Sequence, residues 1–129
     1  MRVFKTRGFA RFARKAKLDD AALCEAVARA ERGLMDADLG GGLIKQRVPR
    51  RGEGRSGGFR TLIAVRLRDR AIFVHGFAKS AQDNLSSHEL LQLKNAAALL
   101  LGFGEREMTQ AVKRKDVQEV FCDAQEISE

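Results

Sequence analysis

Apolar and polar positions change their spacing several times along the chain, and each change marks an expected element. Alternation over residues 2–6 predicts a short strand. Apolar positions three and four apart over residues 9–16, with cations between them, predict a basic amphipathic helix. A second helix is expected to start at Asp19 or Asp20, either of which can cap it, and to end at Gly33. The first third of the chain is therefore expected to be a strand followed by two helices.

Three alternating segments then predict three strands, over residues 43–48, 59–67 and 71–79. The connection between the last two is short enough for a hairpin. The connection between the first two, which is basic and rich in glycine, is expected to be flexible. Alternation places Lys45 and Arg47 on one face of the first of these strands.

Helical spacing returns in the last part of the chain. Ser86 and Glu89 fit a capping box, and the apolar stripe behind them predicts a helix that ends at Gly102. Residues 105–121 are also expected to be helical, as one helix or two short segments.

This order of elements, β-α-α-β-β-β-α-α, predicts an α+β fold as one domain over residues 1–129. Strands joined without helical crossovers pair antiparallel, so we expect a small antiparallel, partly mixed sheet. The N-terminal helices are expected to pack on one face. The second face is expected to stay open and to carry the cations of the strands.

Charge adds a possible partner to this picture. The formal net charge is +7, and the basic residues are concentrated in two blocks. Residues 1–17 hold seven basic and no acidic residues, and residues 45–70 hold nine basic and two acidic residues. Two separate basic blocks favour a polyanionic partner, although solvated surface charge is the alternative.

Other features of the sequence argue against metal sites, cofactors and membrane-spanning segments. Cys24 and Cys122 lack the CxxC spacing, and we expect both to be reduced in a cytoplasmic protein. No Cys, His and Asp spacing resembles a metal site, and no cofactor is expected. No apolar run is long enough to span a membrane, and the start of the chain lacks the apolar region of a signal peptide.

The strands also carry the candidate chemistry. Lys45, Arg47, Arg60 and Lys79 lie on or at the ends of predicted strands, where like charges repel unless an anion lies between them. A polar solvent-exposed face is the alternative. His75 has the parity of Phe73, Phe77 and Lys79, and is either a core or an active-site histidine. The glycine-rich stretch from Gly52 to Gly58 either cradles phosphate or is a plain hairpin loop.

Three segments carry a resemblance to a known family: GGLIKQRV at 41–48, GRSGGFRTL at 54–62 and GFAKSAQDNL at 76–85. They resemble toxins of the RelE/ParE superfamily, and within it the HigB/RelE-like branch. The resemblance implies a microbial ribonuclease-like α+β fold and a type II toxin that cleaves mRNA in the ribosomal A site. It also implies partners: the ribosome, mRNA and a small antitoxin that often has a helix-turn-helix domain.

The resemblance also implies roles for individual residues. Arg60 would stabilise the phosphate, because a guanidinium can bind two phosphate oxygens at once. Lys45 and Lys79 would be candidate base and acid, with His75 as a possible substitute for one of them. Phe77 would stack on a base, and basic residues beside the site would hold the RNA backbone: Arg47, Arg50, Arg51 and Arg55.

The sequence departs from better-known members of the superfamily. It has no tyrosine, no C-terminal catalytic aromatic and histidine pair, and no acidic residue on the second strand. The identity of the general base and acid therefore stays open. Two other functions also stay open: a ParE-like toxin that inhibits DNA gyrase by binding, and a non-catalytic RNA-binding module.

Overall fold

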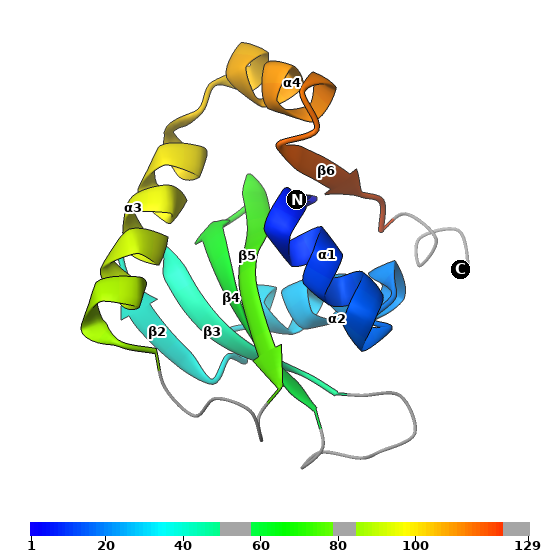
Figure 1. Cartoon of the computed structure of the whole chain (residues 1–129), viewed down its shortest axis with the longest axis vertical. Helices are drawn as coiled ribbons and strands as arrows, with labels where there is room; N and C mark the ends of the chain where they lie inside the picture. Colours follow the sequence, from blue (N-terminus) through cyan, green and yellow to red (C-terminus); the bar gives the residue numbers. More distant parts are fainter. Residues whose placement is uncertain (50–57, 79–84, 123–129) are drawn as a thin grey trace.

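The structure is a computed structural model of the chain, and it describes residues 1–49, 58–78 and 85–122 (Figure 1). In this part of the chain the α+β prediction is confirmed by four helices and six strands. Their order is β1 (Arg2–Thr6), α1 (Arg7–Ala16), α2 (Asp20–Glu31), β2 (Ala37–Gly40), β3 (Leu43–Val48), β4 (Phe59–Arg66), β5 (Arg70–Ala78), α3 (Ser87–Gly102), α4 (Glu105–Lys113) and β6 (Val117–Val120).

The strands form one mixed sheet in the order β2-β3-β4-β5-β1-β6. β1 runs parallel to β5, and every other neighbouring pair is antiparallel. Parallel pairing needs a long connection, and the segment from α1 to β4 supplies it. The expected mixed sheet is therefore confirmed, and β3, β4 and β5 form its centre.

Helices α1 and α2 cover one face of the sheet, as expected. The Thr6 hydroxyl accepts a hydrogen bond from the Phe9 backbone N–H at 3.2 Å and so starts α1. Asp19 starts α2 in the same way, by accepting from Ala22 at 2.9 Å. Phe9 packs on Phe73 of β5, with ring centroids 5.0 Å apart. The core on this side includes Phe9, Ala13, Leu23, Val27, Ile44, Val48, Phe59, Ile63 and Phe73.

The opposite face is not open, so that part of the prediction is wrong. Helices α3 and α4 pack on it and bury a second core, which includes Phe4, Leu43, Leu62, Ala64, Ile72, Ala97, Met108 and Val117. Arg70 ties α3 to the sheet by donating to the Leu100 carbonyl at 3.0 Å, near the helix end where carbonyl groups lack helical partners. The leucine-rich side of α3 needs such a surface to bury itself.

Two strands differ from the prediction. β2 was not expected, and β6 occupies residues that the sequence predicted as helix. Helix α4 ends at Lys113, and two residues further on Lys115 adopts the left-handed conformation, with φ 65°. Its N–H donates to Val112 and the next N–H donates to Ala111, which is the Schellman pattern of a helix end. The chain after Lys115 then pairs with β1, and this long-range pairing overrides the local helical preference.

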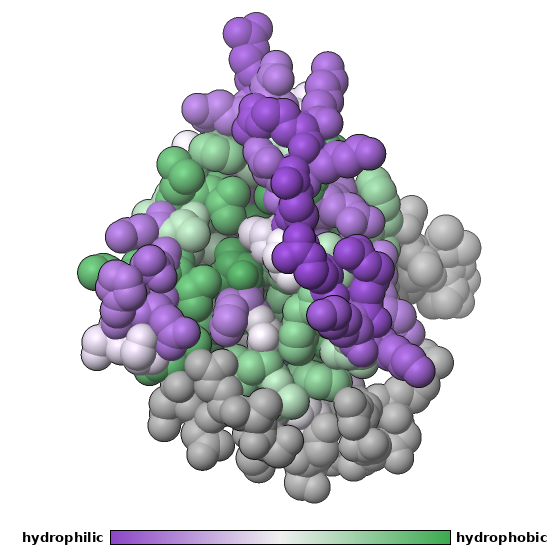
Figure 2. All heavy atoms as spheres, in the orientation of Figure 1, coloured by the Kyte–Doolittle hydropathy of each residue, from purple (hydrophilic) through white to green (hydrophobic). Residues whose placement is uncertain are grey.

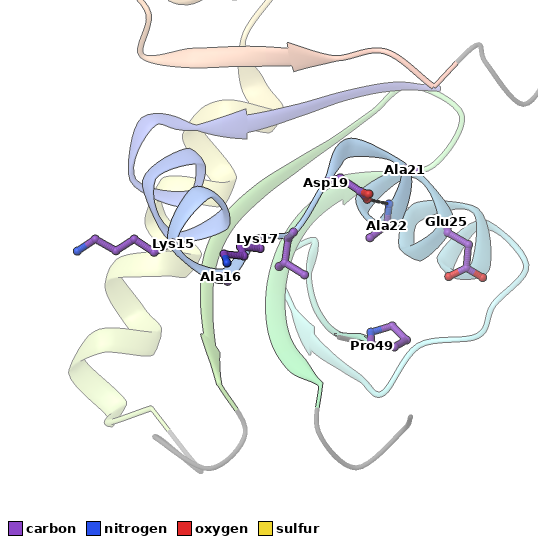
Figure 3. A pocket seen from close by; sticks show the side chains of 9 residues that line it. Lys15, Ala16, Lys17, Asp19, Ala21, Ala22, Glu25 and Pro49 are labelled. Carbon is purple, nitrogen blue, oxygen red and sulfur yellow. Dashed lines mark hydrogen bonds between the residues drawn. The ribbon is translucent and has the colours of Figure 1, made fainter. Parts of the chain in front are cut away.

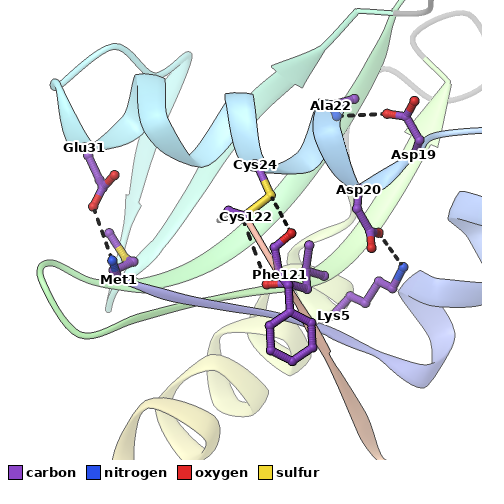
Figure 4. The surroundings of a disulfide bond; sticks show 10 residues. Met1, Lys5, Asp19, Asp20, Ala22, Cys24, Glu31, Phe121 and Cys122 are labelled. Atoms are coloured by element: carbon purple, nitrogen blue, oxygen red, sulfur yellow. Dashed lines mark hydrogen bonds and ion pairs between the residues drawn. A yellow bond between two sulfur atoms is a disulfide. The ribbon is translucent and has the colours of Figure 1, made fainter. Parts of the chain in front are cut away.

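A disulfide joins Cys24 of α2 to Cys122, which follows β6, with Cα atoms 5.7 Å apart (Figure 4). The prediction that both cysteines are reduced is therefore wrong for this structure. It rested on the redox state of a compartment, whereas the pairing follows from geometry, because β6 brings the last described residues to α2. Beside the disulfide, Lys5 pairs with Asp20 at 3.0 Å.

The turn between α1 and α2 borders a pocket of about 830 Å³ that Lys15, Lys17, Glu25 and Pro49 also line (Figure 3). None of the candidate site residues lines this pocket. In the described part of the chain no helix is long and apolar enough to cross a membrane.

Candidate active site

Strand pairing brings the described candidate residues together on the side of the sheet that faces α3. Lys45 pairs with Leu62, which pairs with His75 on β5. One step along, Arg47 pairs with Arg60, which pairs with Phe77. Leu62 belongs to the core under α3, so the two rows lie on that face. We call Lys45, Arg47, Arg60 and His75 the cationic cluster.

A β-bulge in β5 places His75 on the same face as the other residues of this cluster. The register shifts between Leu62 and Ile63, so that Leu62 pairs with His75 whereas Ile63 pairs with Phe73. Val74 is the extra residue, and beyond it the alternation is inverted. Phe73 therefore lies in the core under α1, whereas His75 shares the opposite face with Arg60. The prediction that His75 has the parity of Phe73 is wrong, while its shared parity with Phe77 is confirmed.

Gly76 supports this placement independently. A Cβ atom at Gly76 would lie 2.5 Å from the Phe12 ring of α1, so the position faces α1 and only glycine fits. Because successive residues of a strand point to opposite faces, its neighbours His75 and Phe77 face the other way. Phe77 lies 5.9 Å from His75 between ring centroids and exposes 7 % of its surface. A base could stack on Phe77 only after the side chains that cover it move.

Three buried nitrogen atoms of the cluster have no hydrogen-bond partner among the described residues: Arg47 Nε, Arg60 Nη1 and His75 Nε2. A buried polar atom without a partner costs about 1–3 kcal/mol, so it is uncommon in a folded protein. Here three of them lie on one face of three adjacent strands. Two guanidinium groups on paired positions, about 5 Å apart at Cβ, also repel each other. An anion bound over Arg47 and Arg60 would relieve both costs.

Two carboxylates border the cluster. Asp36, just before β2, lies 3.5 Å from Arg60 Nε through its Oδ2 atom. Glu89, in the first turn of α3, interacts electrostatically with His75. The capping-box prediction is confirmed, because Ser86 N–H donates to Glu89 and Glu89 N–H donates to the Ser86 hydroxyl. These hydrogen bonds are the main reason that the pKa of Glu89 is lowered, and they keep this carboxylate ionised.

The surroundings of His75 shift the pKa of its imidazole. Burial lowers its pKa from the ordinary value of 6.5, and the Glu89 carboxylate opposes this shift more weakly. The imidazole is therefore neutral at pH 7. A neutral imidazole has one nitrogen that can accept a proton, which is the property a general base needs.

Several candidate residues lie outside the described residues: Arg50, Arg51, Arg55 and Lys79. The glycine-rich stretch lies outside them up to Gly57. The structure instead adds Asp36 and Glu89, which the sequence analysis did not connect with the site. Glu89 was recognised only as a helix cap. Asp36 precedes a strand that was not predicted, so no sequence pattern placed it beside Arg60.

The N-terminal basic block lies elsewhere. Arg2 pairs with Glu119 at 2.9 Å and Arg7 with Asp116 at 3.3 Å, so part of this charge is neutralised within the chain. Figure 2 shows hydrophilic side chains gathered over α1 and more hydrophobic surface beside α3. The exposed cations of α1 are Arg7, Arg11, Arg14 and Lys15. A groove of about 440 Å³ is lined by residues of α1 and of the chain from α4 to β6, Arg7, Arg14 and Lys115 among them.

The fold and the cluster together define a small α+β protein with cationic side chains gathered on one face of its sheet. A family model described as "RelE toxin of RelE / RelB toxin-antitoxin system" matches residues 1–120, and the chain belongs to this family of the RelE/ParE superfamily. It is therefore a toxin of a toxin-antitoxin system, and its family implies an antitoxin as a partner. No curated protein matches the chain.

Proposed function

We propose that this toxin is a ribosome-dependent endoribonuclease that cleaves mRNA without a metal ion and so stops translation. The observation that carries the proposal is the set of unpartnered buried nitrogens on Arg47, Arg60 and His75, which converge on one sheet face. A nucleic-acid backbone suits such a face, because each phosphate offers acceptor oxygens to a guanidinium fork. RNA also carries the 2′-hydroxyl from which a neutral imidazole could take a proton. The proposal also assigns the protein to the HigB/RelE-like branch and to the cytoplasm, where mRNA is translated.

The proposed reaction is attack of a ribose 2′-oxygen on the adjacent phosphorus. The 2′-hydroxyl loses its proton, the bond from phosphorus to the 5′-oxygen breaks, and that oxygen takes up a proton. Arg60 binds the phosphate oxygens, on which negative charge increases in the transition state. His75 is neutral and partly buried, which suits it to take the 2′ proton, and Lys45 or Lys79 supplies the proton of the leaving oxygen.

The remaining candidates hold the RNA. Arg47 lies beside Arg60 and contacts the backbone of the substrate, with Arg50, Arg51 and Arg55 extending the same basic surface. Phe77 stacks on a base once the ring is uncovered. The exposed cations of α1 contact ribosomal RNA or an acidic part of the antitoxin, which in this proposal is a helix-turn-helix protein.

A translating extract with a defined reporter mRNA tests the proposal. The wild type should produce cleaved mRNA, mapped by primer extension, whereas cleavage by Lys45→Ala and Arg60→Ala should be strongly reduced. Both variants should still sediment with ribosomes. Arg66→Ala is the matched control, because Arg66 lies at the other end of β4 and pairs with Asp69. Cleavage at the wild-type rate by both variants would reject the site.

Two other functions are distinguished by the same preparation. A gyrase-inhibiting toxin would leave mRNA intact and block the supercoiling of plasmid DNA by gyrase. A non-catalytic RNA-binding module would bind RNA but leave both mRNA and supercoiling unchanged. Neither function requires an imidazole with a lowered pKa beside the phosphate-binding arginines, which is why we favour the nuclease.

A further inference from the structure

Asp36 is fixed to the sheet at the level of the cationic cluster. Its backbone N–H donates to the Lys45 carbonyl at 3.1 Å, and the next residue, Ala37, pairs with Lys45 in the β2–β3 ladder. The backbone of Asp36 is thus held beside the strand that carries Lys45 and Arg47. Its carboxylate is partly buried, with 28 % of the side chain exposed.

Arg60 must cross a strand to meet this carboxylate. Arg60 is on β4, and β3 lies between β4 and the β2 edge where Asp36 is found. Its Nε atom lies 3.5 Å from Asp36 Oδ2, so the side chain extends over β3, and only 16 % of it is exposed. The ion pair therefore holds the Arg60 guanidinium over the strand of Lys45 and Arg47.

The ion pair leaves part of the guanidinium free. A guanidinium has five N–H donors in a rigid planar fork. Asp36 approaches Nε, whereas Nη1 is buried and has no hydrogen-bond partner in the described part of the chain. A carboxylate at one edge of the plane fixes its orientation, and the remaining donors keep a defined direction for a second anion.

Charge gives Asp36 a further effect. Lys45, Arg47 and Arg60 share one face, and among the described residues neither Lys45 nor Arg47 has an ion pair with a carboxylate. Without Asp36, repulsion from Arg47 would push the Arg60 guanidinium away from the cluster. One carboxylate offsets part of the charge of three cations and leaves a net positive site for phosphate.

We propose that Asp36 is a positioning residue for the reaction: it orients the Arg60 guanidinium toward the scissile phosphate without touching the substrate. This inference rests on the proposed nuclease function. It predicts that loss of the Asp36 carboxylate reduces turnover and leaves ribosome binding unchanged. A role limited to anchoring β2 would instead lower stability and leave the cleavage rate per folded molecule unchanged.

The test uses Asp36→Asn, with Asp38→Asn as the matched control on β2. Asp38 accepts a hydrogen bond from the Gly40 N–H at 2.9 Å, which asparagine can also accept, and it has no ion pair with Arg60. Asp36→Asn should lower kcat for mRNA cleavage on ribosomes roughly 10- to 100-fold with little change in KM, because a small misplacement of a catalytic group is costly. Asp36→Glu should restore part of the lost rate, and Asp38→Asn should cleave like the wild type.

A double-mutant cycle tests whether Asp36 affects turnover through Arg60. In an Arg60→Lys background the Nε donor is absent, so Asp36→Asn should lower kcat by less than about 2-fold, well short of its effect in the wild type. An equal loss in both backgrounds would overturn the inference, because Asp36 would then act independently of Arg60. An equal loss in Asp38→Asn would also overturn it, since the cause would be the charge of β2.

A measurement without cleavage separates this inference from the proposed function. NMR relaxation of the Arg60 Nε–H bond should give a rigid order parameter of about 0.8 in the wild type and below about 0.6 in Asp36→Asn. If Arg60 is equally mobile in both, Asp36 does not orient it. If the wild type cleaves no mRNA, the nuclease and the catalytic part of this inference are rejected, and the order parameter still decides whether Asp36 holds Arg60.

Discussion

The two faces of β3, β4 and β5 are made from alternate residues of the same strands, yet they serve different purposes. The face under α1 and α2 is mostly apolar, with Phe59, Ile63 and Phe73 buried. Its buried polar side chains, Gln46 and Thr61, donate hydrogen bonds to backbone carbonyl groups. The face under α3 is apolar at Leu43 and Ile72 but cationic at the other end of the strands. The α1 face stabilises the sheet as a whole. The α3 face can therefore contain like charges that repel one another and donors that have no partner.

The comparison predicts that replacing a core residue of the α1 face mainly lowers the stability of the protein. Phe73→Ala should lower the free energy of unfolding by about 3–5 kcal/mol, because it leaves a cavity beside Phe9. Urea denaturation followed by circular dichroism measures this. The matched control is Phe121→Ala, since Phe121 is 70 % exposed and should cost less than about 1 kcal/mol. Equal losses in the two variants would contradict the comparison.

Arg60→Ala should show the reverse behaviour. Loss of a phosphate-binding donor should slow single-turnover mRNA cleavage about 10²- to 10³-fold. The free energy of unfolding should change by less than about 1 kcal/mol, because the variant also removes a repelling charge and a buried unpartnered nitrogen. A large loss of stability in Arg60→Ala would show that the cationic cluster supports the fold after all.

The disulfide adds to the comparison of the two faces, because it joins α2 to the segment after β6 and should stabilise the α2 side alone. Reduction should lower the free energy of unfolding by about 2–4 kcal/mol, since the bond closes a long loop between residues separated by 98 positions. Thermal unfolding with and without dithiothreitol measures the effect. A variant with both Cys24→Ser and Cys122→Ser should not respond to the reductant. Cleavage of mRNA below the melting temperature should be the same in both redox states.

The smallest expected effect is the pH dependence that His75 contributes. Its folded pKa lies below 6.5, so below that pH the unfolded chain binds a proton that the folded chain does not. Stability from this group is complete above pH 6.5 and falls as the pH drops below it. In His75→Gln, unfolding free energies from pH 7.5 to 5.5 should fall less steeply than in the wild type. An identical slope in the variant would show that the imidazole is not effectively buried.

The sequence predicted those elements that are specified by neighbouring residues, through strand alternation or helix capping. Alternation in β3, β4 and β5 identified the central strands, and the Ser86 and Glu89 pair identified the start of α3. Alternation also placed Lys45, Arg47 and Arg60 on faces that the register then aligned.

Features that depend on distant parts of the chain could not be predicted in this way. β6 exists because it pairs with β1, and the disulfide exists because β6 ends near α2. The bulge at Val74 has no residue type that marks it, so His75 was placed with Phe73. Asp36 reaches Arg60 across another strand, a contact that sequence separation conceals.

The bulge has a consequence for how this surface can change over evolution. Because Val74 is the extra residue, the side of the sheet on which His75 lies depends on how many residues β5 contains as well as on which residues they are. Removing one residue there would exchange the surroundings of His75 and Gly76 without replacing either. Insertions and deletions in β5, which substitution scans do not sample, are therefore the changes that can create or erase this histidine's place beside the arginines.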